Sequence, residues 1–162
     1  MEIRDLYDEN KVLTGETIEK GAPVPKGRYY ITVLVWIMNK NGELLLQQRV
    51  PSKDNKWATT GGHPVSGESS LDGIKTEIKE ELGLDASNID IELINTERTE
   101  DDFVDMYFTK WDVNIDNVKI QEEEVQDVKW ASREEIERMI ANGEFSNSHA
   151  EFYNTLVKYL DK

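Results

Sequence analysis

The chain has 162 residues, of which 38% are hydrophobic, and this is enough material for one folded domain with its own core. Its 19 basic and 33 acidic residues give a net charge of −14, which argues against nucleic-acid binding because that function usually needs a basic face. The absence of cysteine excludes disulfides, thiolate metal sites and cysteine nucleophiles.

The N-terminal half predicts strands around a glycine-containing loop. Residues 2–7 are predicted to form a short strand, and residues 12–27 an irregular arm with room for one more strand. The apolar run at 28–38 is typical of a strand buried on both faces, and it is too short to span a bilayer, which takes about 20 residues. Asn41-Gly42 predicts a hairpin turn into a returning strand at 43–50.

A helix is predicted over residues 70–82, with Ser69 as its N-cap and Gly83 at its end. Its apolar stripe would consist of Leu71, Ile74, Ile78 and Leu82. The remaining elements are expected to be strands at 89–97, 103–113 and 125–131 and helices at 132–140 and 148–160. This order predicts an α+β fold in which helices cover a mixed sheet as a three-layer sandwich.

Three glutamates share one side of the predicted helix. With a step of about 100° per residue, Glu77, Glu80 and Glu81 lie together, whereas both lysines of the helix point to the far side. Like charges at this spacing repel each other. The pattern is explained either by a solvated acidic face or by a site for a hard divalent cation, since Mg²⁺ prefers carboxylate and carbonyl oxygens.

Residues 62–84 resemble the Nudix box, G-x5-E-x7-R-E-U-x-E-E-x-G-U, where U is aliphatic. The matching positions are Gly62, Glu68, Glu77, Ile78, Glu80, Glu81, Gly83 and Leu84. Thr76 stands where the family has arginine. The resemblance covers roughly residues 28–140 and implies a single Nudix-type α/β/α sandwich domain over residues 1–162, in which residues 1–27 form an N-terminal arm.

The resemblance implies a MutT-like hydrolase that cleaves a diphosphate linkage in a nucleoside diphosphate derivative or a related organic pyrophosphate, with Mg²⁺ or Mn²⁺ as cofactor. The implied metal ligands are the Gly61 carbonyl, Glu68, Glu77, Glu80, Glu81 and Glu124. The general base would be Glu77 or a glutamate outside the box, for which Glu124 and Glu123 are the candidates.

Four further residues are candidates for substrate binding. Arg49 could touch a phosphate and Lys53 could steer an anion, although each could also be an ordinary surface cation. His63 could line the site or serve only as a hydrogen-bonding loop residue, and Trp57 could stack on a base or pack in the core. His149 is given no role. The expected partner is a small-molecule diphosphate, without nucleic acid or membrane, and a homodimer is a further expectation because dimers are frequent among relatives.

Two alternatives remain open. Because threonine cannot supply the charge of the family arginine, Thr76 suggests a non-catalytic Nudix module that binds a nucleotide or a protein. The stretch NKWATTGGHPVSGES also resembles isopentenyl-diphosphate isomerase, but that enzyme needs a catalytic cysteine where this chain has Gly61. The N-terminus lacks the basic and apolar pattern of a signal peptide, so a cytoplasmic enzyme is expected.

Overall fold

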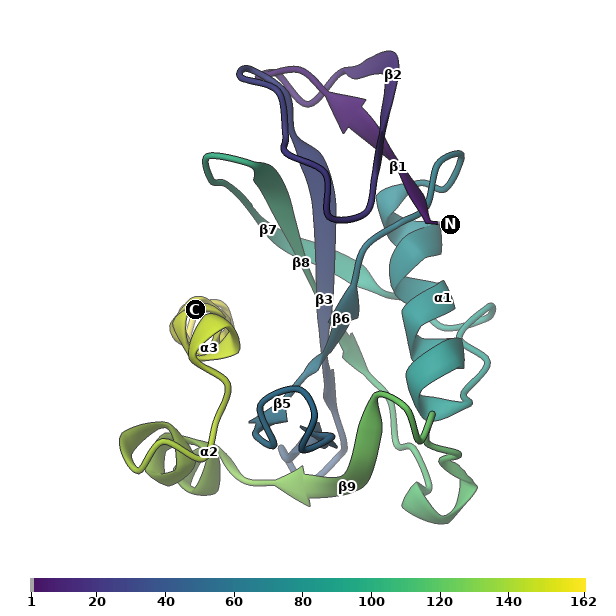
Figure 1. Cartoon of the computed structure of the whole chain (residues 1–162). Helices are drawn as coiled ribbons and strands as arrows, with labels where there is room; N and C mark the ends of the chain where they lie inside the picture. Colours follow the sequence, from purple (N-terminus) through teal and green to yellow (C-terminus); the bar gives the residue numbers. More distant parts are fainter. Residues whose placement is uncertain (1) are drawn as a thin grey trace.

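The computed structural model describes residues 2–162 and has helices on both sides of a mixed sheet (Figure 1). The elements in chain order are β1 (Ile3–Tyr7), β2 (Leu13–Glu19), β3 (Tyr30–Met38), β4 (Leu44–Arg49), β5 (Trp57–Ala58), β6 (Thr60–Gly62), α1 (Ser70–Leu82), β7 (Glu92–Arg98), β8 (Asp102–Lys110), a 3-10 turn (Ile115–Asn117), β9 (Val125–Ala131), α2 (Arg133–Ala141) and α3 (Asn147–Leu160). The predicted α+β sandwich with a mixed sheet is therefore confirmed.

The main sheet has the strand order β5-β4-β3-β8-β7, with β6 also paired to β3 and β9 to β4. It is mixed because β3 and β8 run parallel while the other pairs are antiparallel. β1 and β2 form a separate two-stranded hairpin. In Figure 1 this hairpin lies above the sheet, beside the start of α1.

The alternating side chains of β3 build a core on each face of the sheet. Val33, Val35 and Ile37 are buried in the cluster that includes the apolar side of α1. Leu34 and Trp36 are buried in the opposite cluster, beneath α2 and α3. The continuous apolar run of this strand thus has a cause, since both of its faces exclude water.

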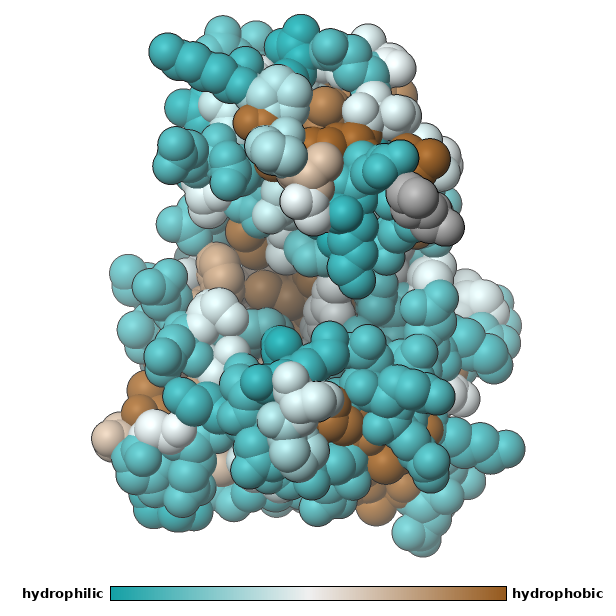
Figure 2. Space-filling model, in the orientation of Figure 1, coloured by the Kyte–Doolittle hydropathy of each residue, from teal (hydrophilic) through white to brown (hydrophobic). Residues whose placement is uncertain are grey.

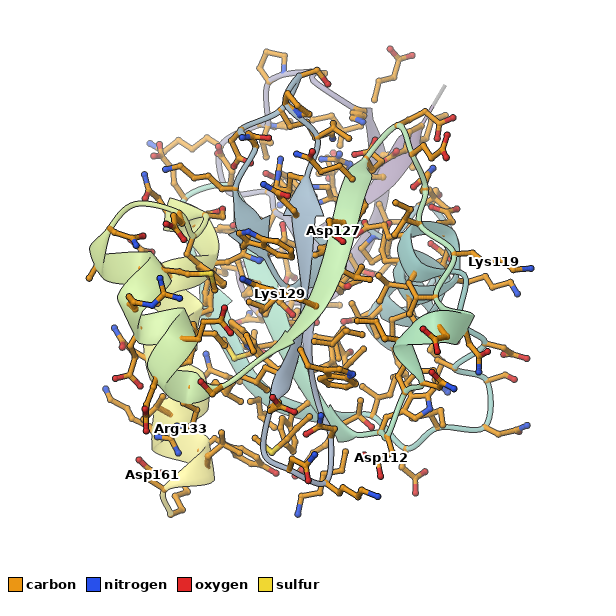
Figure 3. All side chains as sticks on the ribbon, turned by 90° about the horizontal axis from the view of Figure 1, so that it is seen from below. Asp112, Lys119, Asp127, Lys129, Arg133 and Asp161 are labelled. Atoms are coloured by element: carbon orange, nitrogen blue, oxygen red, sulfur yellow. The ribbon has the colours of Figure 1, made fainter. Side chains whose placement is uncertain are left out.

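Helices α2 and α3, which cover one face of the sheet, contact each other at their ends. The Arg133 guanidinium, at the start of α2, donates two hydrogen bonds of 3.1 Å to the Asp161 carboxylate, just after α3 (Figure 3). Leu156 of α3 is fully buried in the same cluster as Ile136 and Met139 of α2. Within residues 2–162, no helix is long and apolar enough to cross a bilayer.

The hairpin predicted around Asn41-Gly42 is wrong beyond its turn. Gly42 adopts the expected positive φ of 79°, but β3 and β4 pair only at Met38 and Leu44. β4 then diverges to pair with β9 and β5, and β6 takes the place beside β3. The Asn-Gly turn is a local feature that the sequence predicts. The pairing of β4 with strands distant in sequence cannot be predicted from a local pattern.

The glycine-containing loop holds two strands that the sequence did not predict, β5 and β6, because two or three residues show no periodicity. Helix α1 has the predicted bounds: the Ser69 hydroxyl accepts a hydrogen bond from the Asp72 N–H, and Gly83 ends the helix in the left-handed conformation at φ 67°. Leu71 is wrong as a member of the buried stripe, since it is 38% exposed. A charged residue, Glu81, is buried instead.

Candidate active site

A cavity of about 770 Å³ separates the acidic side of α1 from the start of α3. Figure 2 shows a hollow in the middle of the face that is turned toward the viewer, with hydrophobic residues in its depth and hydrophilic residues around it. Its charged lining residues are Glu2, Arg4, Lys20, Arg49, Lys53, Glu77, Glu80, Glu81, Asp102, Glu124 and Glu151. Because acidic groups outnumber basic ones, an anionic substrate would meet net repulsion here unless cations accompany it.

Two carboxyl groups of α1, those of Glu77 and Glu81, lie at the cavity wall close enough to change each other's acidity. Gln47 donates a hydrogen bond of 2.8 Å to Glu81 Oε1, and the Thr60 hydroxyl holds Gln47 by donating to its Oε1 at 2.9 Å. Among residues 2–162, neither glutamate forms an ion pair. Glu81 is therefore held by one neutral donor, and the more distant Lys53 offsets its charge only in part.

This environment changes the acidity of both groups. Burial, the hydrogen bond with Glu81 and the negative charges of Glu81 and Glu80 raise the pKa of Glu77 to about 9. Burial also raises the pKa of Glu81, while hydrogen bonds with Glu77 and Gln47 oppose that rise. The two carboxyl groups therefore retain a proton at neutral pH, and a divalent cation is the kind of ligand that would replace it.

The backbone of β6 leaves room for this carboxyl pair because it carries no side chain there. A Cβ at Gly62 would lie only 2.3 Å from Glu77 Cδ, and one at Gly61 would lie 2.7 Å from the Val33 carbonyl oxygen. Gly61 faces Leu34 in the β3–β6 ladder and lines the cavity. The glycine pair thus lets the backbone approach α1 and β3 closely.

Replacing Gly62 by alanine is expected to lower kcat by about 100-fold, because displacing a reacting group by about 1 Å can cost that much. The new methyl group meets the end of a flexible side chain rather than backbone, so the free energy of unfolding should change little. Steady-state kinetics and urea unfolding on the same preparation measure both quantities. Unchanged kcat, or loss of activity caused only by unfolding, would contradict the role assigned to Gly62.

The other acidic candidates differ in whether they line the cavity. Glu80 is exposed at the cavity rim, and Glu124 lies in the cavity lining as the ion-pair partner of Lys53. Glu123 is exposed and does not belong to that lining. In the described part of the chain, no three acidic or histidine side chains already surround one point. A metal would therefore need Glu124 to leave Lys53, or would complete its shell with carbonyl, water and substrate oxygens.

Glu68 lies outside the cavity lining and braces the loop before α1. Its Oε1 accepts a hydrogen bond of 2.9 Å from the Val65 N–H, and its Oε2 accepts one of 2.7 Å from the Thr76 hydroxyl. Thr76, at the position of the family arginine, therefore connects the helix to a box glutamate through a neutral hydrogen bond. The hydroxyl provides an anchor but no positive charge.

Of the four substrate-binding candidates, three line the cavity and one does not. Arg49, Lys53 and His63 line the cavity, and burial lowers the pKa of His63 so that it remains neutral at pH 7. Trp57 is not in the lining; its ring is covered by the Lys129 ammonium 4.4 Å from the ring centroid. The described lining contains no tryptophan or tyrosine, and Phe152 is its one aromatic residue apart from the histidines.

His149, to which the sequence analysis gave no role, lies in the cavity wall, in the first turn of α3. Its ring Nδ1 is buried, and none of the residues 2–162 forms a hydrogen bond with it. His149 was given no role because it is far from the Nudix-box residues in sequence. The packing of α3 opposite α1 brings it to the same cavity. No local motif around His149 could have indicated its position.

The fold, the glutamate-bearing helix and the adjoining glycine loop are shared with a family of known proteins. The sequence model of the NUDIX domain matches residues 28–156, and the chain belongs to this family. An uncharacterized Nudix hydrolase of Listeria monocytogenes is 34% identical over 154 residues, covering 90% of this chain and 88% of that protein. With such relatives over most of its length, the chain is a Nudix hydrolase, a class of enzyme that generally uses divalent metals.

Two other similarities mark the limits of this assignment. The crystal structure of DR0079 from Deinococcus radiodurans superimposes with a TM-score of 0.74 at 22% identity, covering 90% of this chain and 92% of that one, and so shows the shared fold. An isopentenyl-diphosphate Delta-isomerase of Pectobacterium atrosepticum is 37% identical over 83 residues, 49% of this chain and 46% of that protein. The resemblance to the isomerase is therefore real but partial.

Proposed function

We propose that this Nudix hydrolase cleaves the phosphoanhydride bond of a small organic diphosphate, such as a nucleoside diphosphate derivative, with Mg²⁺ or Mn²⁺. The observation that carries the proposal is the Glu77–Glu81 pair, half-buried at Glu77 and buried at Glu81, which lines the cavity without an ion-pair partner in residues 2–162. A cation and a diphosphate entering together would neutralise each other and this acidic wall.

The metal ligands in this proposal are the carboxylates of Glu80 and Glu81 and the Gly61 carbonyl oxygen. Bound divalent ions would supply a more acidic water and would stabilise negative charge on the phosphate oxygens. Once a cation has displaced the proton that the pair retains, Glu77 would orient the attacking water and take its proton, or Glu124 would do so after separating from Lys53. Gln47 holds Glu81 in place through its 2.8 Å hydrogen bond.

An assay of diphosphate compounds with and without Mg²⁺ or Mn²⁺ tests the proposal. We expect hydrolysis of at least one organic diphosphate, and complete loss of turnover when the metal is chelated. A panel of nucleoside diphosphate sugars, dinucleoside polyphosphates and isoprenoid diphosphates, followed by phosphorus NMR, shows which bond is cut. Nucleotide binding without turnover would overturn the proposal in favour of the non-catalytic module.

The isomerase alternative is disfavoured by chemistry. Position 61 is glycine, and the chain has no cysteine to act as the proton-transferring acid expected from the resemblance. The phosphorus NMR assay separates the two reactions, because isomerisation keeps the diphosphate intact whereas hydrolysis splits it.

A further inference from the structure

The end of the cavity that faces α3 differs in charge from the wall formed by α1. Helix α3 begins after Ser146, which makes no side-chain capping hydrogen bond, and its first turn carries no acidic residue. The free N–H groups and the dipole at such a helix start favour an anion. A helix start alone does not define a site, but two side chains beside this one lack hydrogen-bond partners.

Those side chains are His149 and Arg49, which line the same cavity. Within the described residues, the atoms His149 Nδ1 and Arg49 Nε are both buried without a hydrogen-bond partner. Arg49 Nε lies 3.2 Å from Asp54 Oδ1, but the geometry of its N–H is not that of a hydrogen bond. Buried polar atoms are nearly always paired, so the His149 nitrogen indicates a missing partner. Arg49 is already ion-paired with Asp54 and would share its charge with that partner.

The charges around His149 fit an anionic partner. Burial and the nearby Arg49 cation lower the pKa of His149 to about 4, with Asp54 acting in the opposite direction. The ring is consequently neutral at pH 7 and offers one N–H. The carboxylates of Asp54 and Glu151 lie near this end of the cavity and would repel an anion, so Arg49 and the helix start must outweigh them.

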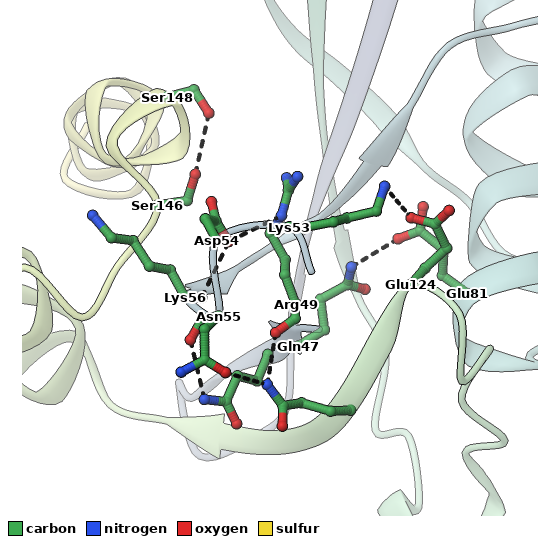
Figure 4. A network of polar contacts seen from close by, with 12 residues as sticks. Gln47, Arg49, Lys53, Asp54, Asn55, Lys56, Glu81, Glu124, Ser146 and Ser148 are labelled. Carbon is green, nitrogen blue, oxygen red and sulfur yellow. Dashed lines mark hydrogen bonds and ion pairs between the residues drawn. The ribbon is translucent and has the colours of Figure 1, made fainter. Parts of the chain in front are cut away.

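The location relative to α1 suggests which part of a substrate arrives here. Gln47 and Arg49 project from the same side of β4, two residues or about 7 Å apart along the strand. Gln47 contacts Glu81, and Arg49 lies between that pair and the serines at the start of α3 (Figure 4). A phosphate chain with one group beside Glu81 would bring its next group toward Arg49.

We infer that Arg49, His149 and the first turn of α3 bind a phosphoryl group of the substrate adjacent to the one beside the acidic cluster. The inference rests on the proposed function for the identity of the substrate, but the anion site can be measured without metal or turnover. It gives His149 and Arg49 the role of substrate-binding residues that set the position of the phosphate chain in the cavity.

Titration of the full chain with inorganic diphosphate in the presence of a chelator tests this inference. We expect diphosphate to shift the ring NMR signals of His149 and raise its pKa. His149→Ala and Arg49→Gln should each weaken binding about ten-fold in calorimetry. Arg138→Gln, which removes a 62% exposed cation on α2, should bind like the unaltered chain.

Inorganic phosphate in a parallel titration distinguishes a site for one phosphoryl group, which either anion fills, from one that requires the linked pair. Thermal melting shows whether each variant is folded, and Arg49→Lys provides a milder change if Arg49→Gln is not. Diphosphate that fails to bind, or binds without affecting His149 or depending on Arg49, would overturn the inference. Since Glu81→Gln should retain this metal-free binding, failed hydrolysis and a failed anion site are distinguishable.

Discussion

Replacing Glu81 by glutamine should lower kcat/KM for the diphosphate substrate by more than about 100-fold. Residues that only support metal ligands typically contribute 10–100-fold, and a ligand itself should contribute at least as much. Glutamine has nearly the same shape, so Gln47 retains a neighbour of similar size while the negative charge disappears. Steady-state hydrolysis at saturating Mg²⁺ measures the loss.

Glu134→Gln is the matched control for this change, because Glu134 is exposed on α2 and does not line the cavity. It removes the same charge and should leave kcat/KM unchanged. Equal activity of Glu81→Gln and the control would show that the Glu81 carboxylate holds no catalytic metal, and would contradict the proposed function.

Replacing Asp105 by alanine should lower the free energy of unfolding by about 2–3 kcal/mol, because three donors lose a fully buried acceptor while the Lys11 side chain, 30% exposed, keeps part of its hydration. Asp105 is 0% exposed and accepts two hydrogen bonds from Lys11 Nζ, at 2.6 and 2.8 Å. It also accepts from the hydroxyl groups of Ser70 at 2.6 Å and Thr96 at 2.7 Å. Alanine would leave all three donors without this acceptor.

Urea unfolding followed by tryptophan fluorescence measures this loss. Asp127→Ala, at an exposed position on β9, should change stability by less than about 0.5 kcal/mol. A loss below about 1 kcal/mol in Asp105→Ala would mean that Lys11 finds another partner or water. Pairing the change with Lys11→Met should recover part of the loss, because the orphaned charge is then removed as well.

This buried cluster also connects the fold to the site. Lys11 lies in the turn between β1 and β2, Ser70 starts α1, and Asp105 belongs to β8, an interior strand of the main sheet. The Ser66 hydroxyl is tied to the same hairpin by a 2.6 Å hydrogen bond to Asp5. The N-terminal arm is therefore attached both to the sheet and to the loop that precedes the glutamates.

The acidic side of α1 was predictable from sequence because it is a local property. Helical geometry places Glu77, Glu80 and Glu81 together, and Ser69 and Gly83 provide recognisable end signals. The spacing could not reveal that Glu81 is buried against Gln47, or that Glu68 hydrogen-bonds to Thr76, since burial and partner choice depend on the packing of other elements.

The cavity wall opposite α1 could not be predicted from local sequence patterns. His149 and Arg49 are distant in sequence and line the same cavity because β5, which pairs with β4, is hydrogen-bonded through Trp57 to Ser146 at the start of α3. Trp57, for which the sequence left base stacking and core packing open, lies outside the described cavity lining with its ring beneath the Lys129 ammonium. Both positions depend on long-range packing.

Calorimetric titration of the metal-free chain with Mn²⁺, in buffers of different ionisation enthalpy, tests most directly whether the carboxyl pair is a metal site. If the pair exchanges its retained proton for the cation, the heat at pH 7 will depend on the buffer and reveal proton release, and both binding and release will be lost in Glu81→Gln. Binding of equal strength in that variant, or no binding at all, would contradict the account.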